Sequence, residues 1–178
     1  MVEYADYRCP FCGVFDRDTK PALVREYVDA GKLRIEWRDL PVFGEQSIAA
    51  AVAARAAGRQ GMFWEYHTAM FAAAPERGHP ELPRERLLEF AREIGVPDIA
   101  RFTADLDDPA LASAVQTDYA EGTRIGIAST PIFIINDTPV AGAQPIDVFR
   151  QTIDAAIAVA EASDVSTRPT TPASQKAE

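Results

Sequence analysis

The sequence predicts an α/β fold in which a block of helices is inserted between strands. A strand, a helix and a second strand follow one another within residues 2–38, and strand character returns only after residue 130. Between these segments the hydrophobic residues recur every three to four positions, as they do in amphipathic helices. The length of 178 residues, with 47% hydrophobic and 25% charged residues, is typical of one globular domain with an insertion.

The N-terminal segment reads as a strand–helix–strand unit. A short strand over residues 2–5 precedes a helix over 10–28, in which Pro21 should produce a kink near Lys20. One apolar stripe along this helix is formed by Phe11, Phe15, Leu23 and Tyr27. Residues 32–38 alternate between apolar and charged side chains, which predicts a second strand. Strands joined in this way should be parallel, with a right-handed crossover.

Residues 45–127 predict about five helices and no strand. The expected helices cover residues 47–57, 62–74, 83–94, a short segment within 97–106, and a longer stretch from Pro109 onward. An apolar run over 131–136 then predicts a buried strand, and 138–142 a short partner strand. Pro145 opens a last helix, and the Ser-, Thr- and Pro-rich residues 163–178 predict a disordered tail.

Charge and hydropathy exclude several classes of function. The net charge of −9 and the isoelectric point near 4.8 disfavour nucleic acid and anionic membranes as partners. No window approaches 18 uninterrupted apolar residues, so no transmembrane helix is predicted. The N-terminus shows no signal-peptide pattern, which predicts either a cytoplasmic protein or a chain from which a leader has been left off.

The two cysteines carry the strongest chemical signal. Cys9 and Cys12 stand two residues apart at the predicted start of a helix, with Pro10 in its first turn. The helix N-terminus stabilises a thiolate on Cys9, while Cys12 lies one turn further in and should be recessed. An exposed acidic thiol beside a buried one suits thiol–disulfide exchange.

Two other interpretations of the cysteine pair remain open. A closed zinc site needs four ligands, so His67 and His79 would have to complete it from within the helical block. Both histidines otherwise look structural or solvated. Alternatively, the two thiols are a purely structural pair, against which Pro10 and the position at a helix start both argue.

The chain resembles the DsbA-type thiol–disulfide oxidoreductases of the thioredoxin superfamily. The resemblance rests on the segments YADYRCPFC, RDLP, STPIFIIN and GAQPIDVF and covers residues 2–160. It implies a thioredoxin-like domain made of residues 1–44 and 128–162, with a helical domain over 45–127 inserted between the second and third strands. Family members usually have a longer first strand, so the N-terminal strand here is expected to be truncated.

The resemblance also implies roles for individual residues. Cys9 matches the nucleophile and Cys12 the resolving cysteine. Pro131, after Thr130, matches the cis-proline that faces the disulfide and exposes the backbone of Thr130 to a bound peptide. Glu3 stands where the superfamily often keeps a buried acid that exchanges a proton with Cys12, although a carboxylate so near the terminus could equally be exposed.

Phe11 occupies the position where some members of the family have a histidine that stabilises the thiolate. We therefore expect Cys9 to be less acidic, and the disulfide less oxidising, than in the most oxidising members. The implied protein is a monomer of the cell envelope that needs no bound cofactor or metal. Its implied partners are cysteine-containing proteins and a membrane protein that re-oxidises the pair.

Residues alone do not separate an oxidase from a reductase or an isomerase. They also leave two functions of other classes open. One is a non-catalytic, chaperone-like module that binds peptides, and the other is a metal-binding or redox-sensing protein.

Overall fold

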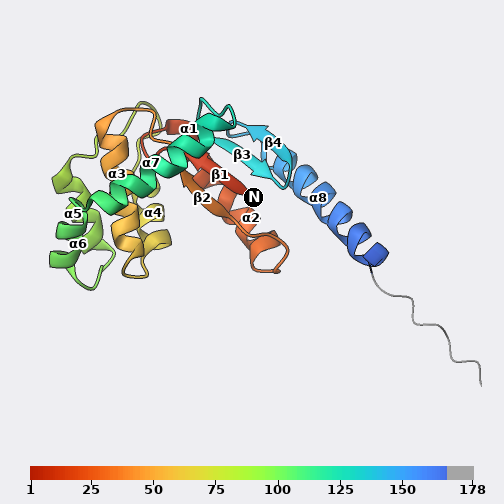
Figure 1. Ribbon diagram of the computed structural model, residues 1–178, viewed down its shortest axis with the longest axis horizontal. Coiled ribbons are helices and arrows are strands. Elements are labelled where there is room, and N and C mark those ends of the chain that lie inside the picture. The colour runs from red at the N-terminus through yellow and green to blue at the C-terminus, as the bar shows by residue number, and fades with distance from the viewer. Residues whose placement is uncertain (168–178) are drawn as a thin grey trace, which may run out of the picture.

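The computed structural model describes residues 1–167 and contains a four-stranded mixed sheet (Figure 1). Its strands are β1 (Val2–Ala5), β2 (Glu36–Asp39), β3 (Ile132–Ile135) and β4 (Thr138–Ala141), in the order β2-β1-β3-β4. β1 is parallel to β2, which confirms the predicted βαβ unit, while β3 is antiparallel to both β1 and β4. The predicted α/β fold with helices inserted between the second and third strands is confirmed.

The crossover helix alternates between α and π geometry. It consists of α1 (Pro10–Val14), η1 (Phe15–Thr19), α2 (Lys20–Leu23) and η2 (Val24–Val28). The wider π turns lie on either side of Pro21. Proline has no backbone N–H, so it cannot donate the hydrogen bond that continues a regular α-helix. The predicted apolar stripe is buried at Phe15 and Leu23 but not at Phe11, which is 63% exposed. The apolar spacing therefore predicts burial correctly for the later turns of the crossover helix but not for Phe11 in its first turn.

The second strand is shorter than the sequence pattern predicted. Residues 32–35 are not part of β2, although the alternation of side chains begins there. The register explains the difference, because Glu36 pairs with Val2 at the start of β1. Met1 precedes that pair, and it bonds to Glu36 and Arg34 through its carbonyl and amino groups. A strand needs a partner along its length, so the ladder begins at Glu36.

The inserted helices lie together on one side of the molecule, and the C-terminal helix lies on the other (Figure 1). They are α3 (Glu45–Gly58), α4 (Phe63–Ala72), α5 (Arg84–Glu93), α6 (Ile99–Asp105) and α7 (Pro109–Arg124). α7 returns to the sheet, where Gly122 lies so close to Leu40 and Tyr4 that an added Cβ would come within 2.9 Å of Leu40 Cδ1. A larger residue at this position would force the side chain of Leu40 to shift.

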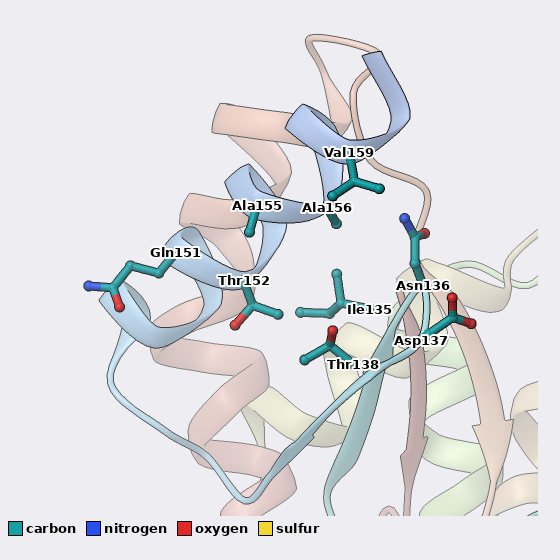
Figure 2. Close-up of a pocket in the computed structure, with 9 residues that line it drawn as sticks. All are labelled: Ile135, Asn136, Asp137, Thr138, Gln151, Thr152, Ala155, Ala156 and Val159. Atoms are coloured by element: carbon teal, nitrogen blue, oxygen red, sulfur yellow. The ribbon is translucent and has the colours of Figure 1, made fainter. Parts of the chain in front are cut away.

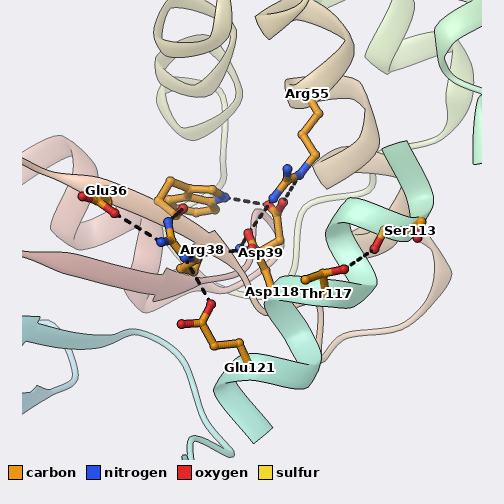
Figure 3. Close-up of polar contacts among 9 residues, drawn as sticks. Glu36, Arg38, Asp39, Arg55, Ser113, Thr117, Asp118 and Glu121 are labelled. Carbon is orange, nitrogen blue, oxygen red and sulfur yellow. Dashed lines mark hydrogen bonds and ion pairs between the residues drawn. The ribbon is translucent and has the colours of Figure 1, made fainter. Parts of the chain in front are cut away.

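A polar cluster also ties the inserted helices to β2 (Figure 3). Arg55 of α3 bridges Asp39 of β2 and Asp118 of α7, and the backbone N–H of Asp39 donates to Asp118. Arg38 of β2 pairs with Glu121 of α7 on the same side. Since Asp39 is buried, these bonds satisfy a carboxylate that would otherwise be costly to hold there.

Two hydrophobic clusters fill the interior. One joins the turn after β1 to the inserted helices and includes both cysteines. The other packs the crossover helix and the β3–β4 hairpin against α8 (Ile146–Thr167). The prediction of a disordered tail from Ser163 was wrong for residues 163–167, because a nucleated helix gains a backbone bond with each added residue. Residues 168–178 of the predicted tail lie outside the described residues.

Candidate active site

The turn between β1 and α1 is fixed by one buried carboxylate. Asp6 accepts hydrogen bonds from the backbone N–H groups of Arg8, Val42 and Phe43, at 2.8, 2.7 and 3.2 Å. The segment that precedes the cysteines is thereby joined to the loop after β2. This arrangement places Cys9 at the N-cap of α1, immediately before Pro10.

The two cysteines and the Thr130–Pro131 segment meet at the start of α1. The Cys9 sulfur accepts the backbone N–H of Cys12 at 3.4 Å, and its thiol lies 3.5 Å from the carbonyl oxygen of Thr130. The Thr130–Pro131 peptide bond is cis. Residues 121 positions apart in the sequence thus share one site. Both cysteines are in the reduced, free form.

The environment separates the proton affinities of the two thiols. Hydrogen bonding from Cys12 lowers the pKa of Cys9 to about 6 against the opposing effect of burial. Burial raises the pKa of Cys12 well above its ordinary value, and the hydrogen bond with Cys9 raises it further. At neutral pH, Cys9 is therefore a thiolate and Cys12 a thiol, as the sequence predicted.

The exposure of Cys9 differs from the prediction. Cys9 is only 2% exposed, so the expectation of an exposed nucleophile was wrong for this reduced state. The sulfur points toward the Thr130 carbonyl and the helix N–H groups rather than to solvent. Phe11, between the cysteines, is the exposed side chain of the motif.

Titration of the Cys9 thiol is a direct test of this electrostatic arrangement. We expect the ultraviolet absorbance of the thiolate to rise with a midpoint near pH 6, because hydrogen bonds to the sulfur favour its charged form. Cys9→Ser should remove this transition. A midpoint near the ordinary cysteine value of about 8.5, or as low as about 3.5, would contradict the prediction.

Glu3 is fully buried, which decides between the two alternatives left open by the sequence. Neither of its carboxylate oxygens has a hydrogen-bond partner among the described residues. Burial raises the pKa of Glu3 to about 7, although the charge of Lys20 lowers it, and the Glu3 charge contributes to the raised pKa of Cys12. A carboxyl group that titrates near neutral pH beside a buried thiol is suited to proton exchange.

The sequence did not identify a buried polar cluster next to Glu3. Lys20 approaches Glu3 at 3.9 Å and bonds to Asp16 at 2.7 Å and to His67 at 2.6 Å. His67 also lies 2.7 Å from Asp16 and 3.1 Å from the hydroxyl of Tyr7. Asp16 and Lys20 stand four residues apart, a spacing at which opposite charges pair on one face of a helix, so the sequence could have predicted this ion pair. The sequence could not have predicted the contact with His67, because that residue lies on a helix far away along the chain.

The other histidine lies elsewhere. His79 is exposed, and its Nδ1 atom bonds to the carbonyl oxygen of Arg8 at 2.7 Å. Within residues 1–167, no group of three or more His, Cys, Asp or Glu side chains is arranged to hold a metal ion. The zinc interpretation, which required both histidines beside the cysteines, therefore receives no support from the geometry.

A groove of about 440 Å³ lies between the β3–β4 turn and α8 (Figure 2). It is lined by Ile135, Asn136, Asp137, Thr138, Gln151, Thr152, Ala155, Ala156 and Val159. Ile135 ends β3, whereas Thr130 precedes its start, so the groove lies at the end of the strand away from the cysteines. It contributes nothing to the dithiol site.

The paired thiols, the cis-proline and the helical insertion place this protein in the class of DsbA-like proteins with the thioredoxin fold. The chain belongs to the thioredoxin family, since the family model described as Thioredoxin matches residues 1–155. Described residues include no helix long and apolar enough to cross a membrane.

Relatives of two kinds match the chain. Disulfide bond formation protein D of Bacillus subtilis is 25% identical over 86% of this chain and 70% of that protein. The Na⁺/H⁺ antiporter NhaA 3 of Salinispora tropica is 33% identical over 90% of this chain. The chain spans only 23% of that antiporter.

Solved structures show the same fold. Oxidised BdbD from Bacillus subtilis superposes with a TM-score of 0.81 at 24% identity, covering 88% of this chain and 86% of that one. A thioredoxin-like oxidoreductase from Silicibacter pomeroyi gives a TM-score of 0.72 at 30% identity, covering 87% and 84%.

Proposed function

We propose that the protein is a thiol–disulfide oxidoreductase that forms disulfide bonds in cysteine-containing proteins through Cys9 and Cys12. The observation that carries this proposal is the separation of the two thiol pKa values, with Cys9 lowered to about 6 and Cys12 raised. A stabilised Cys9 thiolate is a good leaving group, which favours transfer of the disulfide to a substrate. The antiport activity in the name of one relative is not carried over, because the chain spans 23% of that protein.

The oxidising reaction begins from the Cys9–Cys12 disulfide. A substrate thiolate attacks the Cys9 sulfur, the bond between the cysteines breaks, and Cys12 leaves and takes a proton from the Glu3 carboxyl group. A second substrate thiolate then attacks the substrate sulfur of the mixed disulfide and displaces Cys9 as a thiolate. Two electrons have passed from the substrate to the cysteine pair. In the reverse direction Glu3 accepts the Cys12 proton.

Substrate binding is proposed to use the backbone of Thr130 and the side chain of Phe11. The residue before a cis-proline can pair with an extended peptide as a short β-bridge. Phe11 is exposed between the two cysteines, where it can contact an apolar side chain beside the substrate cysteine. Binding must also uncover Cys9, which is 2% exposed in the reduced form.

Repeated turnover requires an electron acceptor. After each cycle the reduced cysteines must return two electrons to a partner, and we propose a redox protein of the membrane for this role. A disulfide-forming protein works in an oxidising compartment, so we place the chain in the cell envelope.

The reduction potential of the Cys9–Cys12 pair tests this function. The protein is equilibrated with glutathione buffers, and the reduced fraction is measured by alkylation. We expect a value between about −270 mV, as in thioredoxin, and about −120 mV, as in the strongest oxidants of this class. The absence of an intramolecular disulfide under oxidising buffers would refute the proposal, and a value at or below about −270 mV would indicate a reductase.

A further inference from the structure

Behind the dithiol, Glu3 faces a small set of titratable groups. These are Cys12 of α1, Asp16 of η1, Lys20 of α2 and Tyr7. His67 of α4 contacts Lys20 and Asp16 through Nε2 and the Tyr7 hydroxyl through Nδ1. The residues that pair with Glu3 on the neighbouring strands, Trp37 and Phe133, are uncharged. Any proton that Glu3 exchanges with Cys12 must therefore leave through this cluster, because Glu3 itself has no exposed surface.

Lys20 is the most exposed member of the cluster. Its side chain is 11% exposed, against 6% for Asp16, and the side chains of Glu3 and His67 are completely covered. Lys20 lines a groove of about 400 Å³ together with Trp64, Val24 and Val28. Its ammonium group stands 4.7 Å from the ring centroid of Trp64, which is 43% exposed. The groove thus gives water access to the Lys20 side of the cluster.

The positions of Asp16 and His67 hold Lys20 in place. The Nε2 atom of His67 lies 2.6 Å from Lys20 Nζ and 2.7 Å from Asp16 Oδ2, and Lys20 and Asp16 are 2.7 Å apart. Since Nε2 carries at most one proton, it either accepts from Lys20 or donates to Asp16. Burial lowers the pKa of His67 to about 4, and the Lys20 charge adds to this effect. His67 is therefore neutral at pH 7 and leaves the ammonium charge on Lys20.

We propose that Lys20 is the proton relay between Glu3 and solvent, with Asp16 and His67 as positioning residues. When Cys12 attacks a mixed disulfide, its thiol proton passes to the Glu3 carboxylate. Lys20 gives one ammonium proton to water in the groove and takes up the proton from Glu3. The lysine, the carboxylate and the cysteine thereby return to their starting charges. This inference rests on the proposed function, because it concerns the proton released during thiol–disulfide exchange.

The relay is tested on the Cys12 step alone. Reduced protein is mixed with one equivalent of Ellman's reagent, and the second equivalent of coloured thiolate is released when Cys12 displaces it from Cys9. We expect Lys20→Ala to slow this second release about tenfold at pH 7, a typical contribution of a proton-transfer group at the lower end of its range. The matched control is Lys32→Ala, which removes an exposed lysine and should leave the rate unchanged.

Rescue by small cations distinguishes proton transfer from charge. Methylammonium can enter the groove and exchange a proton, so it should restore the rate of Lys20→Ala, whereas tetramethylammonium carries charge without an exchangeable proton and should not. Rescue by both cations or by neither would overturn the relay, as would equal rates for Lys20→Ala and Lys32→Ala.

A second variant keeps the test decisive if the alanine variant is poorly folded. Lys20→Arg retains the positive charge, but a guanidinium does not give up its proton, so the second release should again be about tenfold slower. A wild-type rate for Lys20→Arg would overturn the proposal. If the wild-type protein itself released no second equivalent, the proposed redox function would fail instead.

The positioning role of His67 is tested in the same assay. His67→Gln should slow the second release and shift the pH at which it reaches half of its maximal rate, because Lys20 is no longer held beside Glu3. If His67 only packs the core, the urea midpoint of unfolding should change while the pH profile stays in place, and that result would exclude a positioning role.

Discussion

Cys9→Ser is expected to abolish thiol–disulfide exchange, with a loss of at least about a thousandfold in the oxidation of a dithiol peptide. The physical reason is that a serine hydroxyl neither forms the disulfide nor ionises near neutral pH. The measurement is the rate at which the oxidised protein converts a peptide with two cysteines into its cyclic disulfide. Cys9→Ser cannot enter this cycle, because it has no second sulfur to pair with Cys12.

The companion variant Cys12→Ser separates the roles of the two thiols. Cys9 keeps its place at the start of α1, so this variant should still form a mixed disulfide with an activated peptide. The adduct should persist, since no resolving thiol stands behind it, and intact-protein mass spectrometry would detect it. If Cys9→Ser and Cys12→Ser trapped the peptide equally well, the assignment of nucleophile and resolving cysteine would be wrong. If Cys9→Ser kept the wild-type oxidation rate, the chaperone-like alternative would gain support.

The parts of the fold that the sequence predicted are those set by local patterns. The βαβ unit follows from a strand, a helix and a strand in close succession, and the parallel pairing of β1 with β2 is the expected result. The position of Cys9 at a helix start follows from Pro10 two residues before Cys12. Both features depend on residues a few positions apart, which a single sequence displays directly.

The features that the sequence did not predict depend on distant partners. The start of β2 at Glu36 depends on its pairing with Val2 of β1, and the burial of Cys9 involves its contact with Thr130. His67 reaches Asp16 and Lys20 across 51 and 47 positions. No local pattern marks that approach, so His67 was interpreted as an ordinary structural histidine.

Glu3→Gln is the second large effect that we expect, and it concerns stability. In the folded protein the pKa of Glu3 is raised by burial to about 7, against 4.5 for an unperturbed glutamate. Below about pH 4.5 Glu3 is protonated in both the folded and the unfolded chain, so its raised pKa does not lower the free energy of unfolding there. As the pH rises to 7, the unfolded chain ionises first, and folding loses stability. A shift of this size corresponds to about 3 kcal/mol, at roughly 1.4 kcal/mol for each pKa unit.

The measurement is the free energy of unfolding in urea between pH 4.5 and 8, for the reduced wild type and Glu3→Gln. The difference between the two curves should change by about 3 kcal/mol over this interval, in favour of Glu3→Gln at the higher pH. The change with pH is the decisive quantity, because a buried amide adds a constant cost of its own.

Two comparisons identify Glu3 as the source of this slope. Glu85→Gln, at an exposed glutamate of α5, should follow the wild-type curve throughout. His67 has the opposite dependence, because burial lowers its pKa to about 4, and its contribution is lost as the pH falls from about 6.5 toward 4. The two effects have opposite signs within nearly the same range of pH, so Glu3→Gln should leave the His67 dependence alone and make the stability rise more steeply between pH 4.5 and 7 than in the wild type. Parallel curves for Glu3→Gln and wild type would mean that Glu3 is ionised in the folded protein, and it could then not protonate Cys12 when that cysteine leaves the disulfide.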